Sequence, residues 1–451
     1  MDNYQKQIRD AEKQRELMFE AMEYLLRHPE TGFKEWKTQE YLVSVFEKLG
    51  YQLTLAGNIP GFYTDIDTGK PGPTLLIMGE MDALCVPAHP FADPETHAAH
   101  ACGHCAQVAA LCGVAAALKE PGALDGLCGR IRLMAVPAEE CIELDFREEL
   151  RRQGIIHFIG GKPEMIYRGF MEGVDLDILI HTATGRAGDV SVAWGANGTV
   201  SENFTFLGKA AHAAGRPSMG INALYAATTA LGAMNALRET FRDEDHTRMH
   251  PILTNGGLAA NVIPSEAVIE STVRGATLDA IRRVRSKVHR AVAGSAMAIG
   301  ANVTISSRPG YMPQNYTENM RQAAANAVRA AVGEEHLIME KKWGNASSDM
   351  GDMSSILPTA YLHVHGATGS GHGADYRMED RESLVVNAAK VLCVFVRQML
   401  ENNAEAAKAA VAGFEPIYES REAYVRGKDE FEADFTAIEY HEDGTASVRF
   451  D

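Results

Sequence analysis

Short apolar runs alternate with helix-length amphipathic stretches through the first part of the chain and again after residue 310. The runs at residues 74–78, 130–136 and 177–180 are strand-like, and a charged helical pattern lies near residues 144–153. Such alternation is typical of α/β domains, in which helices cover a largely parallel sheet. We therefore predict an α/β fold with a mixed, mostly parallel sheet flanked by helices.

The pattern changes between residues 186 and 309. Strands are expected there at 190–194, 199–207 and 302–306, with further strands near 262–273, and helices are expected at 222–237 and 278–298. This order resembles a β-α-β-β-α-β unit. We predict an inserted α+β, ferredoxin-like domain at 186–309, a discontinuous catalytic domain at 1–185 and 310–403, and a C-terminal extension at 404–451. The extension fits a helix and hairpin or a loose tail, and no function is assigned to it.

Composition narrows the classes of function. The formal net charge is −17, and the chain has 46% apolar and 23% charged residues, as globular proteins do. An acidic chain without a Lys/Arg-rich block repels phosphate backbones, so nucleic-acid binding is not expected. The N-terminal helical pattern lacks the apolar core of a signal peptide, and we expect no run long enough to span a bilayer. A cytoplasmic protein without membrane contact is expected.

Seven cysteines are too few in 451 residues for a disulfide framework, and they favour reduced thiols or metal ligands. The run HACGHC places Cys102 and His104 two residues apart, so that a thiolate and an imidazole can reach one cation from a tight turn entering a helix. Buried thiols with incidental histidines would explain the run as well, and Cys102 with Cys105 could instead be a redox pair.

Two adjacent glutamates, Glu139 and Glu140, follow the strand predicted at 130–136. Open α/β sheets build their sites at the carboxyl ends of strands. Two adjacent carboxylates at such a position can have different roles. One can bind a metal ion while the other takes a proton from a water molecule that the ion activates. A solvated pair at a helix start, favoured by the helix dipole, is the simpler interpretation of the glutamates taken alone.

Two histidines complete a set of donors. His181 ends the strand predicted at 177–180, and His372 lies between glycines in GSGHGAD. A lone histidine is more often structural than a ligand. Five residues together nevertheless supply sulfur, nitrogen and oxygen donors for one or two divalent ions: Cys102, His104, Glu140, His181 and His372. Zinc suits a thiolate, and manganese, cobalt or nickel would also fit such a mixed site.

The motifs HACGHCAQ, PAEE, GKAAHAA and GSGHGADY, with His181 between the second and third, occur in a fixed order. In this the chain resembles the two-metal aminoacylase and carboxypeptidase family of metallopeptidases (peptidase family M20), from His28 to about Asp375. The likeness is strongest to the amidohydrolase branch, which includes aminoacylases, hippurate hydrolases and hydrolases of indole-acetyl amino acids. It implies a metal-dependent enzyme that cleaves the amide bond of a small N-acyl amino acid, dipeptide or related amide.

The resemblance also implies a role for each residue. Cys102 would bridge two divalent ions, and His104, Glu140, His181 and His372 would complete their coordination. Glu139 would be the general base that deprotonates an activated water molecule. Asp82 would not bind an ion itself but would orient one of the metal-binding side chains by contacting it on the side away from the ion. A strand-end cap would explain Asp82 without any such role.

The inserted domain resembles the lid and dimerisation domain of this family, which implies a homodimer. His212, in GKAAHAA, would reach the site of the partner subunit and stabilise the oxyanion. Asn261 matches a further polar position of the lid. Arg274 is a candidate for holding a substrate carboxylate, although a surface charge closing a strand explains it equally well.

Two positions depart from the family, which usually has Asp where Cys105 and Glu80 stand. Both departures lie beside the predicted metal site and bear on metal preference and substrate, and Cys105 could be an additional ligand. Other classes of protein stay open. A hydrolytic deaminase of an aryl or heteroaryl amine would use the same activated water. A non-catalytic dimeric binding protein would have no need of Glu139, and a redox protein leaves the glutamate pair unexplained.

Overall fold

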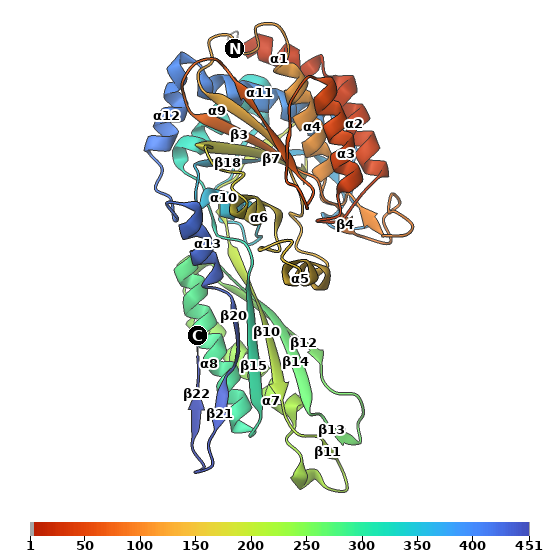
Figure 1. The fold of residues 1–451 in the computed structure, drawn as a ribbon, viewed down its shortest axis with the longest axis vertical. Helices are drawn as coiled ribbons and strands as arrows, with labels where there is room; N and C mark the ends of the chain where they lie inside the picture. The colour runs from red at the N-terminus through yellow and green to blue at the C-terminus, as the bar shows by residue number, and fades with distance from the viewer. Residues whose placement is uncertain (1–3, 451) are drawn as a thin grey trace. The chain divides into compact units, whose positions relative to one another are not determined.

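The computed structural model describes residues 4–450, which divide into two compact units (Figure 1). Unit 1 consists of the residues up to Trp194, Asn315–Lys342 and Asp352–Arg421. Unit 2 consists of Gly195–Gln314, Trp343–Gly351 and the residues from Glu422 on. That unit 1 is a catalytic domain and unit 2 a lid remains a prediction.

Unit 1 is built on a nine-stranded sheet in the order β1-β2-β6-β3-β7-β18-β8-β17, with β19 paired to β18. Its central strands β6, β3, β7 and β18 run parallel, whereas β2 and β8 join them antiparallel. The strands are β1 (Thr54–Leu55), β2 (Phe62–Asp67), β3 (Thr74–Glu80), β6 (Arg130–Val136), β7 (Leu176–Thr184), β8 (Val190–Val192), β17 (Leu337–Met339), β18 (Thr359–Thr368) and β19 (Arg377–Met378). The predicted mixed, mostly parallel sheet is confirmed.

Helices cover this sheet. α4 (His104–Ala117) is buried at every residue because its sequence is apolar and Ala-rich on all sides, and it packs on β3 and β7. The other helices of unit 1 are α1 (Gln5–Glu12), α2 (Arg15–Arg27), α3 (Trp36–Lys48), α5 (Leu144–Arg152), α6 (Gly161–Tyr167), α9 (Glu318–Ala331), α11 (Ala388–Leu400) and α12 (Glu405–Ala412). The residues of α10 (Met350–Ser354) are divided between the two units.

A π-helical turn at Glu382–Asn387 leads into α11. The whole stretch Glu382–Leu400 is long and apolar enough to cross a membrane, which corrects the expectation that no run reaches that length. Inside the structure 78% of its apolar window is buried, as is typical of a core helix.

Unit 2 contains an antiparallel sheet in the order β12-β14-β10-β15-β20, against which α7 and α8 pack. Buried and partly exposed residues alternate along β10 and β15, as expected when one face of a sheet is covered. The elements β10 (Gly198–Leu207), α7 (Ala223–Ala236), β12 (Arg248–Asn255), β14 (Glu266–Gly275), α8 (Leu278–Ala298) and β15 (Asn302–Pro309) follow one another along the chain. The predicted α+β, ferredoxin-like order is thereby confirmed.

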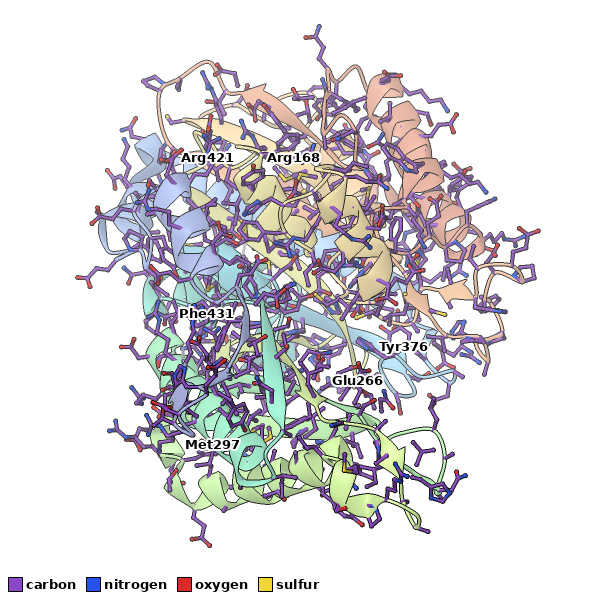
Figure 2. All side chains as sticks on the ribbon, turned by 60° about the horizontal axis from the view of Figure 1, so that its bottom comes forward. Arg168, Glu266, Met297, Tyr376, Arg421 and Phe431 are labelled. Atoms are coloured by element: carbon purple, nitrogen blue, oxygen red, sulfur yellow. The ribbon has the colours of Figure 1, made fainter. Side chains whose placement is uncertain are left out.

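The end of the chain belongs to unit 2. α13 (Arg421–Asp429) precedes β20 (Ala433–Thr436), which pairs antiparallel with β15, and β21 (Ile438–Tyr440) forms a hairpin with β22 (Ala446–Val448). Phe431, labelled in Figure 2, and Phe435 are buried in the apolar core of this unit. Of the two forms considered for the extension, the structure has the helix and hairpin.

Asp177, on β7, is a fully buried carboxyl. Its Oδ1 accepts a hydrogen bond from Thr359 Oγ1 at 2.6 Å, and its Oδ2 has no hydrogen-bond partner among residues 4–450. Burial raises the pKa of Asp177 to about 8, although the Thr359 hydroxyl and Lys162 act in the opposite direction. An unfolded aspartate titrates near pH 4. Between about pH 4 and 8 the folded protein therefore holds a proton that the unfolded chain releases, and stability falls as the pH rises.

We expect Asp177→Asn to remove this pH dependence. The free energy of unfolding of the variant, minus that of the wild type, should increase by about 1.4 kcal/mol per pH unit across this range, as measured by urea denaturation at several pH values. Asp67→Asn is the control, because it makes the same chemical change at a side chain that is 63% exposed. A pH-independent difference for Asp177→Asn would mean that the buried carboxyl is ionised.

Candidate metal centre

The predicted ligands come from separate segments that meet at one edge of the large sheet. Asp82 follows β3, Glu139 and Glu140 follow β6, and His181 lies in β7. Because these three strands are parallel neighbours, their carboxyl ends lie side by side, and residues that follow different strands come together there.

The start of α4 brings two more donors to this edge. Gly103, between Cys102 and His104, has a φ of +86°, and a Cβ there would lie 2.0 Å from Thr182 Oγ1. Thr182 Oγ1 donates to the Cys102 carbonyl at 2.8 Å and lies 2.9 Å from the hydroxyl of Tyr376, which Figure 2 labels. Only glycine allows this close approach of the helix start to β7.

Three groups of donor side chains within unit 1 have ligand atoms that all lie within 4.8 Å of one another. The groups are Cys102, His104 and His181; Cys102, Glu140 and His372; and His104, Glu139 and Glu140. Cys102 belongs to the first two groups. The structure thus brings together all five predicted ligands and Glu139, whereas their roles remain predictions.

Hydrogen bonds leave one nitrogen of each central histidine facing the cluster. His104 Nδ1 lies 2.9 Å from the carbonyl oxygen and 3.0 Å from Oδ1 of Asp82. His181 Nδ1 lies 2.7 Å from the Thr182 carbonyl, and its Nε2 is 3.4 Å from Cys102 Sγ. A histidine that donates from Nδ1 to an oxygen presents the lone pair of Nε2, the arrangement that ligating histidines adopt. Asp82 is thus in contact with His104, and its role in orienting a ligand stays a prediction.

His372 reaches the cluster from the loop after β18. Its backbone N–H donates to the Ala101 carbonyl at 2.9 Å, which ties the loop to the segment before Cys102. Its Nε2 lies 3.1 Å from Glu140 Oε1, and this contact raises the pKa of His372.

The donors fit a divalent cation. Two buried atoms that face the cluster, His104 Nε2 and Glu140 Oε1, have no hydrogen-bond partner among residues 4–450. Burial alone would lower the pKa of His104, but the Cys102 thiol and the neighbouring carboxylates raise it well above its usual value, so this field favours positive charge. Burial raises the pKa of Cys102, and a bound cation would hold it as thiolate.

Two ionisable residues that the sequence analysis does not single out, Glu35 and Arg147, hold the turn that contains the glutamates. Ala138 has a φ of +54°, a strained value for a residue with a side chain, and its N–H donates to Glu35 Oε1 at 2.8 Å. The buried Arg147 donates to the carbonyl oxygens of Glu140 and Ile159. In the sequence, Glu35 and Arg147 look like ordinary helix charges, and no local pattern distinguishes them.

Cys105 is separate from the cluster. Its side chain is buried in the apolar core, with Sγ 3.7 Å from Met378 Sδ, and it belongs to none of the donor groups found within residues 4–450. Cys102 and Cys105 are both free thiols in the structure.

The other three predicted residues lie in unit 2. His212, on β11 (Ala211–His212), is exposed, and its Nδ1 accepts hydrogen bonds from the N–H groups of Ala214 and Gly215 at 3.2 and 2.9 Å. Asn261 is exposed beside it, where its carbonyl accepts from the Ala213 N–H. Arg274, on β14, donates to Ser347 Oγ at 3.4 Å.

Residues 76–398 match the model of Peptidase family M20/M25/M40, which is more than half of the chain. The chain belongs to this family. Indole-3-acetyl-aspartic acid hydrolase of Enterobacter agglomerans is 28% identical over 332 residues, covering 62% of this chain and 71% of that protein. One of the two p-aminobenzoyl-glutamate hydrolase polypeptides of Escherichia coli (strain K12) is 27% identical over 398 residues, which cover 84% of this chain and 76% of that protein.

Solved structures agree with the fold. The Bacillus subtilis YXEP protein, a dinuclear metal binding peptidase from the M20 family, matches with a TM-score of 0.68 at 20% identity, covering 86% of this chain and 99% of that one. The family comparisons confirm the predicted class of enzyme, a metal-dependent amidohydrolase of the aminoacylase type, and do not favour a deaminase or a binding protein. Metal identity, oligomeric state and cellular location remain predictions.

Proposed function

We propose that the protein hydrolyses the amide bond of a small N-acyl amino acid, dipeptide or related amide with the help of two divalent ions. The observation that carries this proposal is the membership of Cys102 in two donor groups, because a shared thiolate is suited to bridging two ions. One ion would be held by Cys102, His104 and His181, and the other by Cys102, Glu140 and His372.

Glu139 is proposed as the general base. When bound, the ions lower the pKa of a water molecule and polarise the amide carbonyl. The Glu139 carboxylate is buried and lies within 4.8 Å of donor atoms of His104 and Glu140, so it is in reach of a proton on that water. The water oxygen would form the new bond to the amide carbon, and the C–N bond would break as Glu139 returns the proton to the leaving amine, so that a carboxylate and a free amine result.

His212 is proposed to donate to the oxyanion in the site of the partner subunit. Two backbone N–H groups donate to its Nδ1, so the neutral ring carries its proton on Nε2 and can donate from there. We propose a homodimer formed through unit 2, with Asn261 as a further polar contact and Arg274 holding a substrate carboxylate.

The two relatives named above are called hydrolases of an indole-acetyl aspartate and of an aminobenzoyl glutamate, which favours an acylated amino acid as substrate. Zinc or manganese is the proposed ion, and cobalt or nickel also fits a set of sulfur, nitrogen and oxygen donors. We further propose a cytoplasmic enzyme without nucleic-acid or membrane partners.

Metal content and product analysis test this function together. Plasma emission on the purified wild type should find about two divalent ions per chain, as two-metal hydrolases carry. A panel of N-acyl amino acids should yield carboxylate and free amino acid, and chelation should abolish turnover. Turnover that persists in metal-free protein would contradict the proposal, and release of ammonia from an aryl amine would indicate a deaminase.

A further inference from the structure

Glu80, the last residue of β3, is a fully buried carboxylate whose two oxygens have different surroundings. Oε1 forms an ion pair with the equally buried Lys162 of α6. Oε2 accepts a hydrogen bond from Gln107 Nε2, on α4, at 2.7 Å. Burial raises the pKa of Glu80, but Lys162 and the nearby histidines more than offset this and lower it, so the group is a carboxylate.

The second oxygen also faces the donor cluster. Glu80 Oε2 lies 3.2 Å from His104 Nε2 and 4.0 Å from His181 Nε2. These are the nitrogens that both rings leave available once their Nδ1 atoms bond to oxygens of Asp82 and Thr182. The contact at 3.2 Å is not a hydrogen bond, because His104 Nε2 has no hydrogen-bond partner among the described residues.

Distances of this size are those between donors that share an ion. Two donors that each lie about 2.0–2.2 Å from one cation are roughly 3–4 Å apart, depending on the angle between them. Glu80 Oε2 meets this condition with both histidines. Cys102 Sγ lies 3.4 Å from His181 Nε2 and so meets this condition with that histidine.

We propose that Glu80 is a fourth ligand of the ion held by Cys102, His104 and His181. This inference rests on the two-metal function proposed above and adds an oxygen donor to it. Because Lys162 pairs with Oε1, only Oε2 of Glu80 is available to the ion. The positive charge of Lys162 also compensates the negative charge that Glu80 adds beside the Cys102 thiolate. An aspartate at this position would be one methylene shorter and would not reach as far into the cluster.

The test compares wild type with the double variant Glu80→Gln/Lys162→Met. The double change removes both members of the buried ion pair, whereas a single neutralisation would leave one of them without the other. Proteins loaded with Zn²⁺ are dialysed against graded chelator, and their zinc is counted. The wild type should keep two ions. The double variant should keep one and bind the other about 100-fold more weakly or worse, beyond the 10–100-fold typical of losing a residue that only orients a ligand.

Cobalt substitution gives an independent readout, because the visible absorption of Co²⁺ changes with its coordination number. The spectrum of one of the two ions should change in the double variant. Gln107→Leu is the matched control, since it removes a hydrogen bond to the same Oε2 but keeps the carboxylate, and it should retain both ions and the wild-type spectrum.

Glu80→Asp keeps the charge and serves if the double variant does not fold, as judged by circular dichroism. It should weaken the same single ion, because the shorter side chain withdraws the oxygen. If wild type binds two ions and the folded variants bind both with unchanged affinity and spectrum, Glu80 is not a ligand and the two-metal function stands. If the wild type does not bind two ions, both the two-metal function and the role of Glu80 as a ligand are overturned.

Discussion

Glu139→Gln should lower kcat by about 10²- to 10⁴-fold, the usual contribution of a general base, while both ions stay bound. The amide that replaces the carboxylate has similar size but cannot take a proton from water. Glu139 is buried, 8% exposed, within the donor group that also contains His104 and Glu140. Steady-state kinetics on the best substrate of the N-acyl amino acid panel and plasma emission on the same sample measure both quantities.

Glu143→Gln is the control for this variant. Glu143 stands in the same loop, but its carboxylate faces Lys34 at 2.6 Å on the surface, so its loss should leave kcat unchanged. Near-normal kcat in Glu139→Gln would assign the proton transfer to another group. Loss of metal together with activity would instead make Glu139 a ligand.

Cys102→Ala should remove both ions at once, and activity should fall to background. One donor group contains His181 and another contains His372, and among residues 4–450 only Cys102 belongs to both. The loss of its thiolate should therefore weaken both sites. The ion count per chain should therefore drop from about two toward zero under chelator conditions that leave the wild type fully loaded.

Cys105→Ala is the matched control, because this thiol lies in the same segment and is buried against Met378. It should keep both ions and the wild-type activity. Loss of only one ion in Cys102→Ala would show that the thiolate does not bridge. Loss of metal in Cys105→Ala would make that thiol the additional ligand considered from the sequence.

Much of the fold could be predicted because its strands and helices have strong local patterns. The strand predicted at 130–136 is β6, and the helix predicted at 278–298 is α8. Other elements lacked such a pattern. β12 is an exposed edge strand that contains Pro251, a residue that normally argues against a strand, and it was missed. The N-terminal helical pattern corresponds to two helices in the structure, α1 and α2.

The last residues of the chain show the limit of local patterns more clearly. β20 is only four residues long, and it is a strand because β15 offers it an edge to pair with. Its Phe435 is buried by contacts with residues far away in the sequence. An edge strand of this kind depends on its partner, which the local sequence does not show.

The sequence by itself determined the chemistry of this protein: the donor types, their order in the motifs, and their places at the ends of apolar strands. The tertiary structure alone decided which ionisable groups surround these donors and the turns that carry them. Glu35 meets Ala138 and Lys162 meets Glu80 over separations of 103 and 82 residues. The physical reason is that a buried polar or charged group is stabilised by whichever partner the fold brings into contact, and such pairing leaves no periodic pattern in the sequence.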